Sequence, residues 1–581
     1  MRLAVREKIS EIISSDKNTK QAIADEYGID PRSFDLSEND GELEIVKKLN
    51  ELMRSDDIIL REMLTTICRE SPEREMLNFD GVKYTCGEML RNVEDLAVNF
   101  IEIGIKKGTK TAVILDNCIE YIYSYFALFY IGALPVPINI RWKKDELYRV
   151  LDNAGVSFII CAEKAGSMPY GEYVGEYAAS RCAVQNVIYK DVNQFGNKGV
   201  KFNALLKGSR IDETELDAIN PDDIAMISYT SGTTGMPKGV LLKNNHIYKI
   251  SKYSAEYWCS DRSDRPFSIA PLYSAQGFLS LIINVASECP FKMISSFNPN
   301  DIIKEISRCE NTIIHTQPTM WNLLLNCRII DFARFDSLEK LVVSGSLCSP
   351  ALAGRIEERM KCSLMNAYGL IEGTSVVTMT RLDDPEDVRV NTVGRVIEGV
   401  EIKIVDEDRK EVPHGEVGEL AVRGYNMAGY YNNPEKTSEV IDSDGWLYTG
   451  DLARFYDKEN ISIVGRCKDM IIRGGFNVYP SDIEEYLLQM SDIQNAAVVG
   501  RKHEVLGEEI CAFIVRKAGS NLVDRDVFKF LFDKVSNYKM PDKIYFVSEL
   551  PIILAGKIDK KILSGWAENG IPDEKTILFE S

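Results

Sequence analysis

The sequence is poor in the residues on which most metal and redox centres depend. It contains only four histidines, which lie far apart, and its thirteen cysteines include no Cys-x-x-Cys pair. This distribution argues against a zinc site and favours a hard metal bound by carboxylates. Scattered cysteines are typical of a reducing compartment, and the first residues lack the apolar core of a signal peptide. We therefore expect a cytoplasmic protein.

An excess of positive charge is also missing. The formal net charge is -19 and the pI is about 5.0. Nucleic acids require a basic protein face, so no nucleic-acid partner is expected. One uncharged run, 121–140, is long enough to cross a membrane. Because Gly132, Pro135 and Pro137 interrupt it, the run predicts a buried helix followed by a strand, and no transmembrane segment.

The length of 581 residues exceeds what one hydrophobic core usually supports, so several domains are expected. Residues 1–64 are charged and have short amphipathic stretches, which predicts a helical extension of unknown role. Part of it, near Tyr27 to Pro31, faintly resembles a carrier-protein domain, although Gly41 stands where a phosphopantetheine serine would be needed. Residues 65–465 are expected to form a large domain, and 466–581 a small, mobile one.

The large domain shows alternating helix and strand patterns. The predicted elements are a helix over Glu88–Ile103, a strand over Lys110–Leu115, a helix over Tyr121–Gly132, a strand over Val136–Ile138, a helix from Lys144 and a strand over Phe158–Cys161. This order predicts an α/β fold of mostly parallel sheets flanked by helices. Short strands between Gly418 and Gly465 predict a β-rich subdomain. Beyond it, strands over Ala496–Val499 and Ile510–Val515 and a helix over Asp526–Val535 predict an α+β domain.

The segment from Tyr229 to Gly239 is the most informative part of the chain. It follows an apolar strand-like run, Ile224–Ile227, and concentrates glycine, hydroxyl groups and one lysine. Backbone N–H groups at glycines can converge on an anion, and hydroxyls and a lysine add donors and charge. The candidate phosphate-binding residues are Thr230, Ser231, Gly232, Thr233, Thr234, Gly235 and Lys238. The spacing is not that of a Walker A loop, and a plain surface turn is the alternative.

This loop resembles the signature of the adenylate-forming enzymes, which include acyl-CoA synthetases, peptide-synthetase adenylation domains and insect luciferase. The resemblance extends from about Tyr84 to Leu563. It implies that a carboxylic acid is activated with ATP and Mg²⁺ as an acyl-adenylate, and that the acyl group is then transferred to a thiol. Coenzyme A is the first candidate for that thiol. Catalysis of the first step consists mainly of positioning and of stabilising phosphoryl charge.

Two further segments match the family's nucleotide site. In the first, Tyr368 is expected to pack on adenine, and Glu372 to bind Mg²⁺ with Thr230 as a possible second ligand. In the second, Asp451 is expected to accept the ribose hydroxyls, with Arg466 beside it. The other residues assigned to the nucleotide by this resemblance are Gly345, Ser346, Asn366, Ala367 and Gly369. A solvated loop acid at 372 and a turn cap at 451 are the alternatives.

The C-terminal part resembles the family's moving domain. Lys468 occupies the hinge position, and Gly475 belongs to the face expected to serve thioester formation. Lys557 is the predicted catalytic lysine, whose ammonium would bridge the substrate carboxylate and the α-phosphate. Two departures, Ile371 and Ile553, stand where the family usually has threonine. Loss of the hydroxyl at 371 would weaken adenylation by about 1.5 to 3 kcal/mol.

The segment Pro271–Phe278 matches the acyl pocket of the family and contains no carboxylate. An amino acid substrate is therefore disfavoured, because its buried ammonium group would lack a partner. Ser274, where a larger ring often stands, would leave the pocket deeper or open to thiol entry. The leading interpretation is an acid:CoA ligase that acts as a monomer or homodimer. Transfer to a phosphopantetheinyl carrier protein is the alternative, and a non-catalytic acyl-nucleotide binder is a third.

Overall fold

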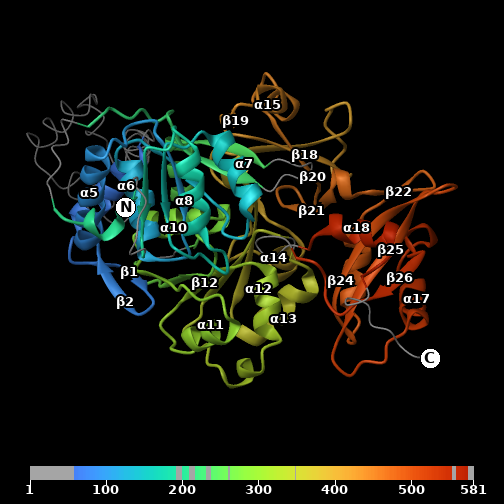
Figure 1. Cartoon of the computed structure of the whole chain (residues 1–581). Helices are drawn as coiled ribbons and strands as arrows, with labels where there is room; N and C mark the ends of the chain where they lie inside the picture. The colour runs from blue at the N-terminus through green and yellow to red at the C-terminus, as the bar shows by residue number, and fades with distance from the viewer. Residues whose placement is uncertain are drawn as a thin grey trace, which may run out of the picture. The chain divides into compact units, whose positions relative to one another are not determined.

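The computed structural model describes residues 58–191, 199–208, 216–230, 237–258, 262–346, 348–552 and 558–572. Contacts divide the chain into one unit of residues 1–58 and a second of residues 59–581. The helices and strands drawn in colour in Figure 1 belong to the second unit. The short helices and the carrier-like segment expected near the N-terminus lie, up to residue 57, outside the described residues.

A five-stranded parallel sheet has the order β4-β3-β5-β6-β7. Its strands are β3 (Lys110–Ile114), β4 (Leu134–Pro137), β5 (Phe158–Cys161), β6 (Asn186–Tyr189) and β7 (Gly199–Lys201), and the helices between them are α6 (Ile119–Tyr130), α7 (Lys144–Ala154) and α8 (Tyr170–Ser180). Strand β5 is buried along its whole length, as its apolar sequence predicts. Leu147 and Val150 of α7 and Val174 of α8 pack with Ala112 and Ile159 in one core.

The uncharged run 121–140 forms most of α6, a turn at Gly132 and strand β4. Strand β4 is the last in its sheet. The N–H groups of Leu134 and Ile138 donate to carbonyl groups of the β3 segment, at 2.8 Å and 3.0 Å. Pro135 and Pro137 alternate with these residues and occupy the outward positions, where proline is tolerated because no ladder donor is needed there. In the described ranges, no helix is long and apolar enough to span a membrane.

A nine-stranded sheet has the order β16-β15-β14-β13-β12-β10-β11-β1-β2. Its strands are β1 (Glu75–Phe79), β2 (Val82–Thr85), β10 (Pro266–Ser268), β11 (Phe291–Met293), β12 (Ile313–Thr316), β13 (Lys340–Val343), β14 (Ser363–Leu370), β15 (Ser375–Met379) and β16 (Arg395–Val396). The six central strands are parallel, in the spatial order β14-β13-β12-β10-β11-β1. Strands β2, β15 and β16 pair antiparallel at the two ends of the sheet. The carboxyl ends of β12, β13 and β14 therefore meet at one edge.

Helices cover both faces of this sheet. Helices α9 (Asn244–Trp258) and α10 (Ala275–Ala286) contribute to a core that includes Ile313, Val342 and Met365. Helices α11 (Pro299–Ile306), α12 (Pro318–Leu325) and α13 (Pro350–Met360) contribute to a second core that includes Ile314, Leu341 and Leu364. Because neighbouring residues of one strand point to opposite faces, these two cores lie on opposite sides of the sheet. The helix predicted from Glu88 is α5 (Cys86–Glu102), which begins at the Thr85 cap and contacts α4 (Leu60–Glu70).

Two smaller antiparallel sheets follow. One consists of β8 (Ile224–Thr230), β9 (Lys238–Lys243) and β19 (Gly429–Tyr430), in the order β19-β9-β8; the other consists of β17 (Glu401–Val405), β18 (Gly418–Arg423), β20 (Leu447–Phe455) and β21 (Ile461–Arg466). The second sheet is the β-rich part predicted between Gly418 and Gly465. It packs its Ile404, Leu420 and Ala453 into the same core as α9.

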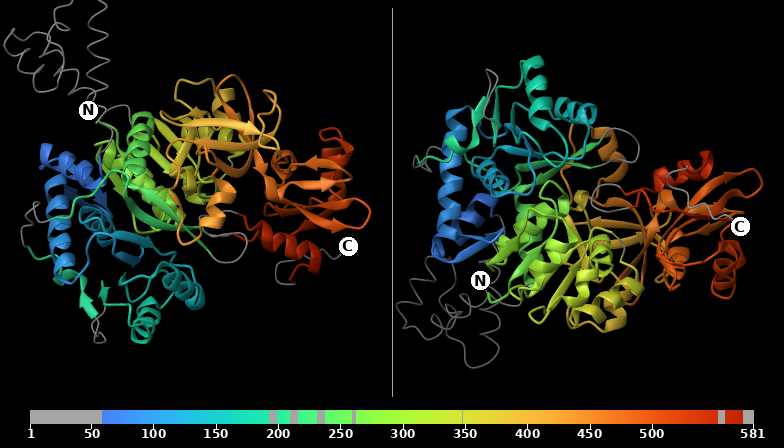
Figure 2. Two further views of the ribbon diagram at one scale, coloured as in Figure 1. Left: turned by 90° about the horizontal axis from the view of Figure 1, so that it is seen from above. Right: turned by 60° about the horizontal axis from the view of Figure 1, so that its bottom comes forward.

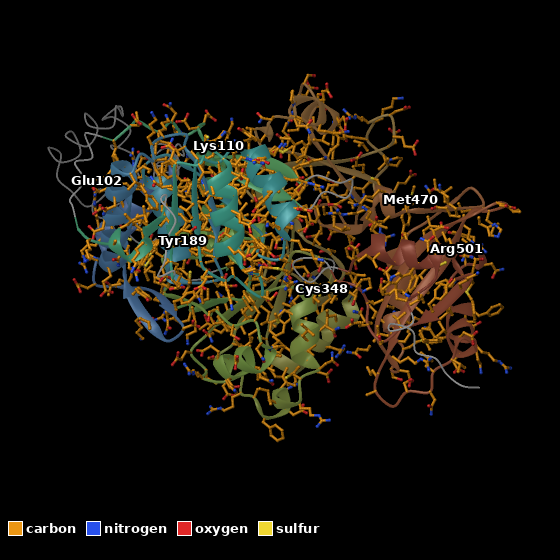
Figure 3. All side chains as sticks on the ribbon, viewed as in Figure 1. Glu102, Lys110, Tyr189, Cys348, Met470 and Arg501 are labelled. Carbon is orange, nitrogen blue, oxygen red and sulfur yellow. The ribbon has the colours of Figure 1, made fainter. Side chains whose placement is uncertain are left out.

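The C-terminal part forms its own sheet, and its elements lie together in Figures 1 and 2. They are β22 (Ile471–Arg473), α16 (Pro480–Leu488), β23 (Phe476–Val478), β24 (Ile493–His503), β25 (Gly507–Arg516), α17 (Asp524–Phe532), β26 (Lys543–Phe546) and α18 (Lys560–Asn569). Both predicted strands are present within longer ones, and α17 ends at Phe532, three residues before the predicted end. The predicted fold class, with parallel sheets flanked by helices, a β-rich part and a C-terminal α+β part, is confirmed.

Candidate functional site

The signature loop connects β8 to β9. Thr230 ends β8 and lies opposite Lys238, which begins β9. The predicted phosphate-binding residues between them, Ser231, Gly232, Thr233, Thr234 and Gly235, lie outside the described residues. Gly239 has a packing role, because a Cβ atom there would lie 2.9 Å from Ile227 Cγ2. The loop therefore starts and ends on two strands that are tightly paired at its base.

The segment from Asn366 to Glu372 lies at the carboxyl end of β14 and in the short helix η5 (Ile371–Gly373). The Asn366 side chain donates to the Arg389 carbonyl at 2.8 Å and fixes this strand end. A Cβ atom on Gly369 would lie 1.4 Å from a backbone oxygen of β15, so glycine is required where β14 and β15 shift register. Ala367 and Ile371 are buried. Tyr368 thus lies on the part of β14 that pairs with β15, and Glu372 lies in the short helix that directly follows the strand.

Tyr368, Asp451 and Arg466 form a chain of contacts. The Tyr368 hydroxyl donates to Asp451 Oδ2 at 2.7 Å, and Arg466 Nε lies 2.9 Å from Asp451 Oδ1. Asp451 and Arg466 are paired residues of β20 and β21. Burial, and then the charge of Asp451, raises the pKa of Tyr368, so its hydroxyl remains a donor. Asp451 likewise raises the pKa of Arg466. Each carboxylate oxygen can accept a second hydrogen bond, so ribose hydroxyls can be added to these contacts.

The loop after β13 carries Ser344, Gly345 and Ser346. Gly345 has a φ of +89°, a left-handed conformation that favours glycine. A Cβ atom at this position would lie 3.2 Å from Gln276 Oε1. The loop is therefore fitted closely to the start of α10, as expected for a loop that brings its backbone near a ligand.

A network of uncharged groups underlies this loop. Gln317 Nε2 donates to Gln276 Oε1 at 2.5 Å, so the amide nitrogen of Gln276 faces His315 Nε2, at 3.1 Å. Ser344 Oγ lies 2.8 Å from the same ring nitrogen. His315 Nε2 therefore accepts, and Nδ1 carries the proton toward Ser280 Oγ at 2.6 Å. Burial lowers the pKa of His315 to about 3, so the ring is neutral. Nothing in the sequence indicated this network.

Ser274 is the N-cap of α10. Its Oγ accepts a hydrogen bond from the Gly277 N–H at 3.1 Å and donates to the Pro271 carbonyl at 2.7 Å. Capping of this kind satisfies a backbone donor that the helix itself leaves unpaired. The small size of residue 274, which suggested a deeper pocket, thus has a local structural reason.

Tyr430, which was not among the predicted residues, contacts two of the candidate site residues. Its hydroxyl donates to Glu372 Oε1 at 3.0 Å, and Lys238 Nζ lies 4.6 Å from the centre of its ring. The contact to Glu372 joins residues 58 positions apart. Its only sequence signal is a pair of tyrosines between a glycine and two asparagines, which by itself assigns no role.

Lys468 and Gly475 belong neither to the contacts around Asp451 nor to those around Tyr430. Lys468 is exposed, in the short helix η6 (Cys467–Asp469) between β21 and β22. Gly474 and Gly475, with φ of +60° and +84°, form the two-residue turn between β22 and β23. Two consecutive positive φ values are what a tight hairpin turn of this length requires. Lys557 lies outside the described residues, next to Ile558, which forms a bridge with Ile552.

The donor set fits a magnesium ion that is bound together with a nucleotide. Across the described ranges, no three acidic, cysteine or histidine side chains group into a metal cage. Magnesium in nucleotide sites usually takes one or two carboxylates and completes its shell with phosphate oxygens and water. Glu372 supplies such a carboxylate, one oxygen of which is engaged by Tyr430.

Two family descriptions match the chain. The family described as AMP-binding enzyme matches residues 64–431, and the one described as AMP-binding enzyme C-terminal domain matches residues 482–557. The second match begins after the predicted hinge at Lys468 and ends at Lys557. The first match contains the loop, Tyr368 and Glu372, and the second contains β24, β25 and β26 of the C-terminal sheet; Asp451 and Arg466 lie between the two matches.

The chain is also similar to full-length relatives. It is 29% identical over 517 residues to the putative acyl-CoA synthetase YngI of Bacillus subtilis, covering 84% of this chain and 93% of the relative. It is 31% identical to triostin synthetase I of Streptomyces triostinicus, covering 87% and 94%. The solved structure of ATP-bound MatB from Rhodopseudomonas palustris matches with a TM-score of 0.78 and 25% identity, covering 88% of this chain and 99% of that one.

Proposed function

This chain belongs to the family of AMP-binding enzymes and is an AMP-forming ligase of the acyl-CoA synthetase type, and we propose how its residues divide the reaction. A carboxylate oxygen of the acid attacks the α-phosphorus of ATP, and the bond from that phosphorus to pyrophosphate breaks. The sulfur of coenzyme A then attacks the acyl carbon. The bond to AMP breaks, and the thiol proton leaves to solvent. The products are acyl-CoA, AMP and pyrophosphate.

The adenosine end of ATP is assigned to Tyr368, Asp451 and Arg466. Asp451 accepts the ribose hydroxyls, Tyr368 lies against adenine, and the Gly345–Ser346 backbone borders the base. The observation that supports this proposal best is the series of contacts that joins β14, β20 and β21: a hydrogen bond from Tyr368 to Asp451 and an ion pair from Asp451 to Arg466. A carboxylate oriented from both sides by protein donors is preorganised, so it needs little rearrangement to bind a nucleoside.

The phosphate end is assigned to the signature loop, with Thr230, Ser231, Gly232, Thr233, Thr234, Gly235 and Lys238. Glu372 would hold Mg²⁺, with Thr230 as a possible second ligand. When bound, the ion would supply charge neutralisation of the phosphates. The position of Lys238 at the base of the loop, within 4.6 Å of the Tyr430 ring that also contacts Glu372, supports a common phosphate and metal site.

The C-terminal part is assigned the switch between the two half-reactions. Lys557 would offset the charge that develops between the acid and the α-phosphate. Rotation about Lys468 would then replace Lys557 with the face that carries Gly475. The exposed position of Lys468, in a short linking helix between two separate sheets, supports this division into domains at residue 466.

Coenzyme A is the acceptor supported by the relatives, one of which is named as an acyl-CoA synthetase. The acid is proposed to lack an α-amino group, because the segment Pro271–Phe278 contains no carboxylate to pair with a buried ammonium. A reducing, cytoplasmic setting is proposed as well, since the cysteines of the described ranges are free thiols.

The test is mass spectrometry of the purified protein with Mg·ATP, coenzyme A and a panel of aliphatic and aromatic acids, reading acyl-AMP and acyl-CoA together. We expect acyl-CoA from at least one acid, with pyrophosphate released in equal amount. Acyl-AMP that accumulates without a thioester would point to a carrier protein as the acceptor. Absence of both products across the panel, with ATP still bound, would contradict the proposed reaction.

A further inference from the structure

Strand β19 places Tyr430 between two parts of the phosphate site. Gly429 and Tyr430 pair antiparallel with Leu241 and Val240 of β9, the strand that starts at Lys238. The Lys238 ammonium lies over the ring of Tyr430, 4.6 Å from its centre. The hydroxyl at the far end of the same ring donates to Glu372 Oε1 at 3.0 Å. One side chain therefore touches both the lysine of the loop and the candidate metal ligand.

Backbone hydrogen bonds fix this arrangement on both sides. The Met427 N–H donates to the Glu372 carbonyl at 2.7 Å, and the Tyr431 N–H donates to the Gly239 carbonyl at 2.7 Å. The Tyr430 N–H itself donates to Thr437 Oγ1 at 2.9 Å. The segment 427–431 is thus anchored to η5, to β9 and to α15 (Pro434–Val440). Tyr430 is 7% exposed, so it cannot be displaced by a simple side-chain rotation into solvent.

The direction of this hydrogen bond is also defined. A carboxylate offers only acceptors and a tyrosine hydroxyl ordinarily carries its proton at neutral pH, so Tyr430 donates and Glu372 Oε1 accepts. A donor on Oε1 restricts the torsions of a side chain that otherwise samples many rotamers. The carboxylate is thereby oriented before any ligand arrives.

We propose that Tyr430 is a positioning residue for the metal–nucleotide complex, which holds the Glu372 carboxylate for Mg²⁺ and the Lys238 ammonium for the phosphates. This inference rests on the proposed function, because it assigns Mg²⁺ to Glu372 and phosphate to Lys238. Partners that orient a metal ligand typically change metal affinity by about 10- to 100-fold when removed. The electrostatic attraction between the ammonium and the face of the ring helps to place the lysine.

The test compares Tyr430→Phe with Tyr448→Phe. The first change removes the hydroxyl but keeps the ring beneath Lys238. The second removes a hydroxyl that donates to another carboxylate, Asp442 Oδ2, at 2.9 Å, so it is a matched loss of a tyrosine–carboxylate hydrogen bond. For each protein we would measure Mn²⁺ binding to the protein–ATP complex by electron paramagnetic resonance, the Mg²⁺ dependence of pyrophosphate release, and the Tm.

Tyr430→Phe is expected to weaken Mn²⁺ binding about tenfold and to raise the Mg²⁺ concentration for half-maximal rate by a similar factor. The rate at saturating Mg²⁺ should stay within about threefold of wild type. Both variants should lower the Tm by similar amounts, because each loses one tyrosine–carboxylate hydrogen bond. Tyr448→Phe should leave the affinity for Mn²⁺ unchanged. In a Glu372→Gln background, Tyr430→Phe should have no further effect on Mn²⁺ binding, because the oriented ligand is already lost.

Unchanged Mn²⁺ affinity in Tyr430→Phe, or an equal loss in the Glu372→Gln background, would overturn the positioning role. If acyl-CoA still forms in that case, the proposed function stands without this inference. If instead the metal affinity falls as expected while no acid of the panel is activated, the positioning role stands and the proposed reaction is wrong. A change of Tm alone, without a change in metal binding, would reduce Tyr430 to a structural residue.

Discussion

Replacement of Asp451 by asparagine removes the negative charge that lies between the Tyr368 hydroxyl and the Arg466 guanidinium. Two ribose hydroxyls bound to a carboxylate would each contribute about 1.5 to 3 kcal/mol. The single amide oxygen of asparagine can retain one of them, so the net loss is about 1.5 to 3 kcal/mol. This corresponds to a roughly 10- to 150-fold weaker affinity for ATP. Because the Arg466 side chain is 47% exposed, its guanidinium can rehydrate, and the stability loss should stay below about 1 kcal/mol.

The assay is the KM for ATP and for its 2′- and 3′-deoxy analogues in pyrophosphate release, with the Tm as a measure of folding. Wild type should discriminate against both deoxy analogues, and Asp451→Asn should lose the discrimination against one of them. Tyr368→Phe serves as the control, because it removes one donor from Asp451 but keeps the carboxylate and the ring. Equal discrimination by wild type and Asp451→Asn would refute the assignment of Asp451 to the ribose.

Three further changes test other parts of the molecule. Lys557→Ala should slow acyl-AMP formation by at least about 100-fold but spare thioester formation from synthetic acyl-AMP, and equal losses in both half-reactions would contradict its role. Ser274→Ala should cost about 1 kcal/mol in urea unfolding through loss of the α10 cap and leave the acid preference unchanged; an altered preference would place Ser274 in the pocket. Because folding lowers the pKa of His315 to about 3, the unfolded chain binds a proton below pH 6.5 that the folded chain does not. His315 alone should therefore lower the stability by up to about 1.4 kcal/mol per pH unit below pH 6.5, and His315→Gln should remove this contribution to the slope.

The strands and helices that could be predicted from the sequence are those whose pattern is local. Strand Phe158–Cys161 is a short apolar run and is found with those bounds. The helix from Lys144 was also expected, because charged residues at its start precede apolar ones at helical spacing. Even the uncharged run 121–140 was assigned correctly, since Gly132 and the prolines mark where the helix stops.

The contacts that build the site could not be read in the same way. Tyr430 meets Glu372 across 58 residues, and Gln276 meets Ser344 across 68. Such pairs depend on how strands are ordered in space, and neither local propensity nor periodicity records that order. The family resemblance named Tyr368, Glu372 and Asp451 individually as candidates. It did not indicate that Tyr368 and Asp451 are hydrogen-bonded to each other, or that Glu372 has a tyrosine partner.

The two prolines of β4 have a mechanical consequence for the signature loop. Strand β8 lies beside β4 but belongs to a different sheet. The N–H groups of Leu134 and Ile138 point toward β3, so the positions facing away from β3 are those of Pro135 and Pro137, which have no N–H to offer. A continuous ladder from β4 to β8 is therefore blocked at two successive positions. The hairpin that carries the loop therefore meets the five-stranded sheet through side chains, with Ile227 of β8 in the same core as Val136 of β4. A displacement of the hairpin is passed to that sheet by side-chain packing and not by a hydrogen-bonded ladder.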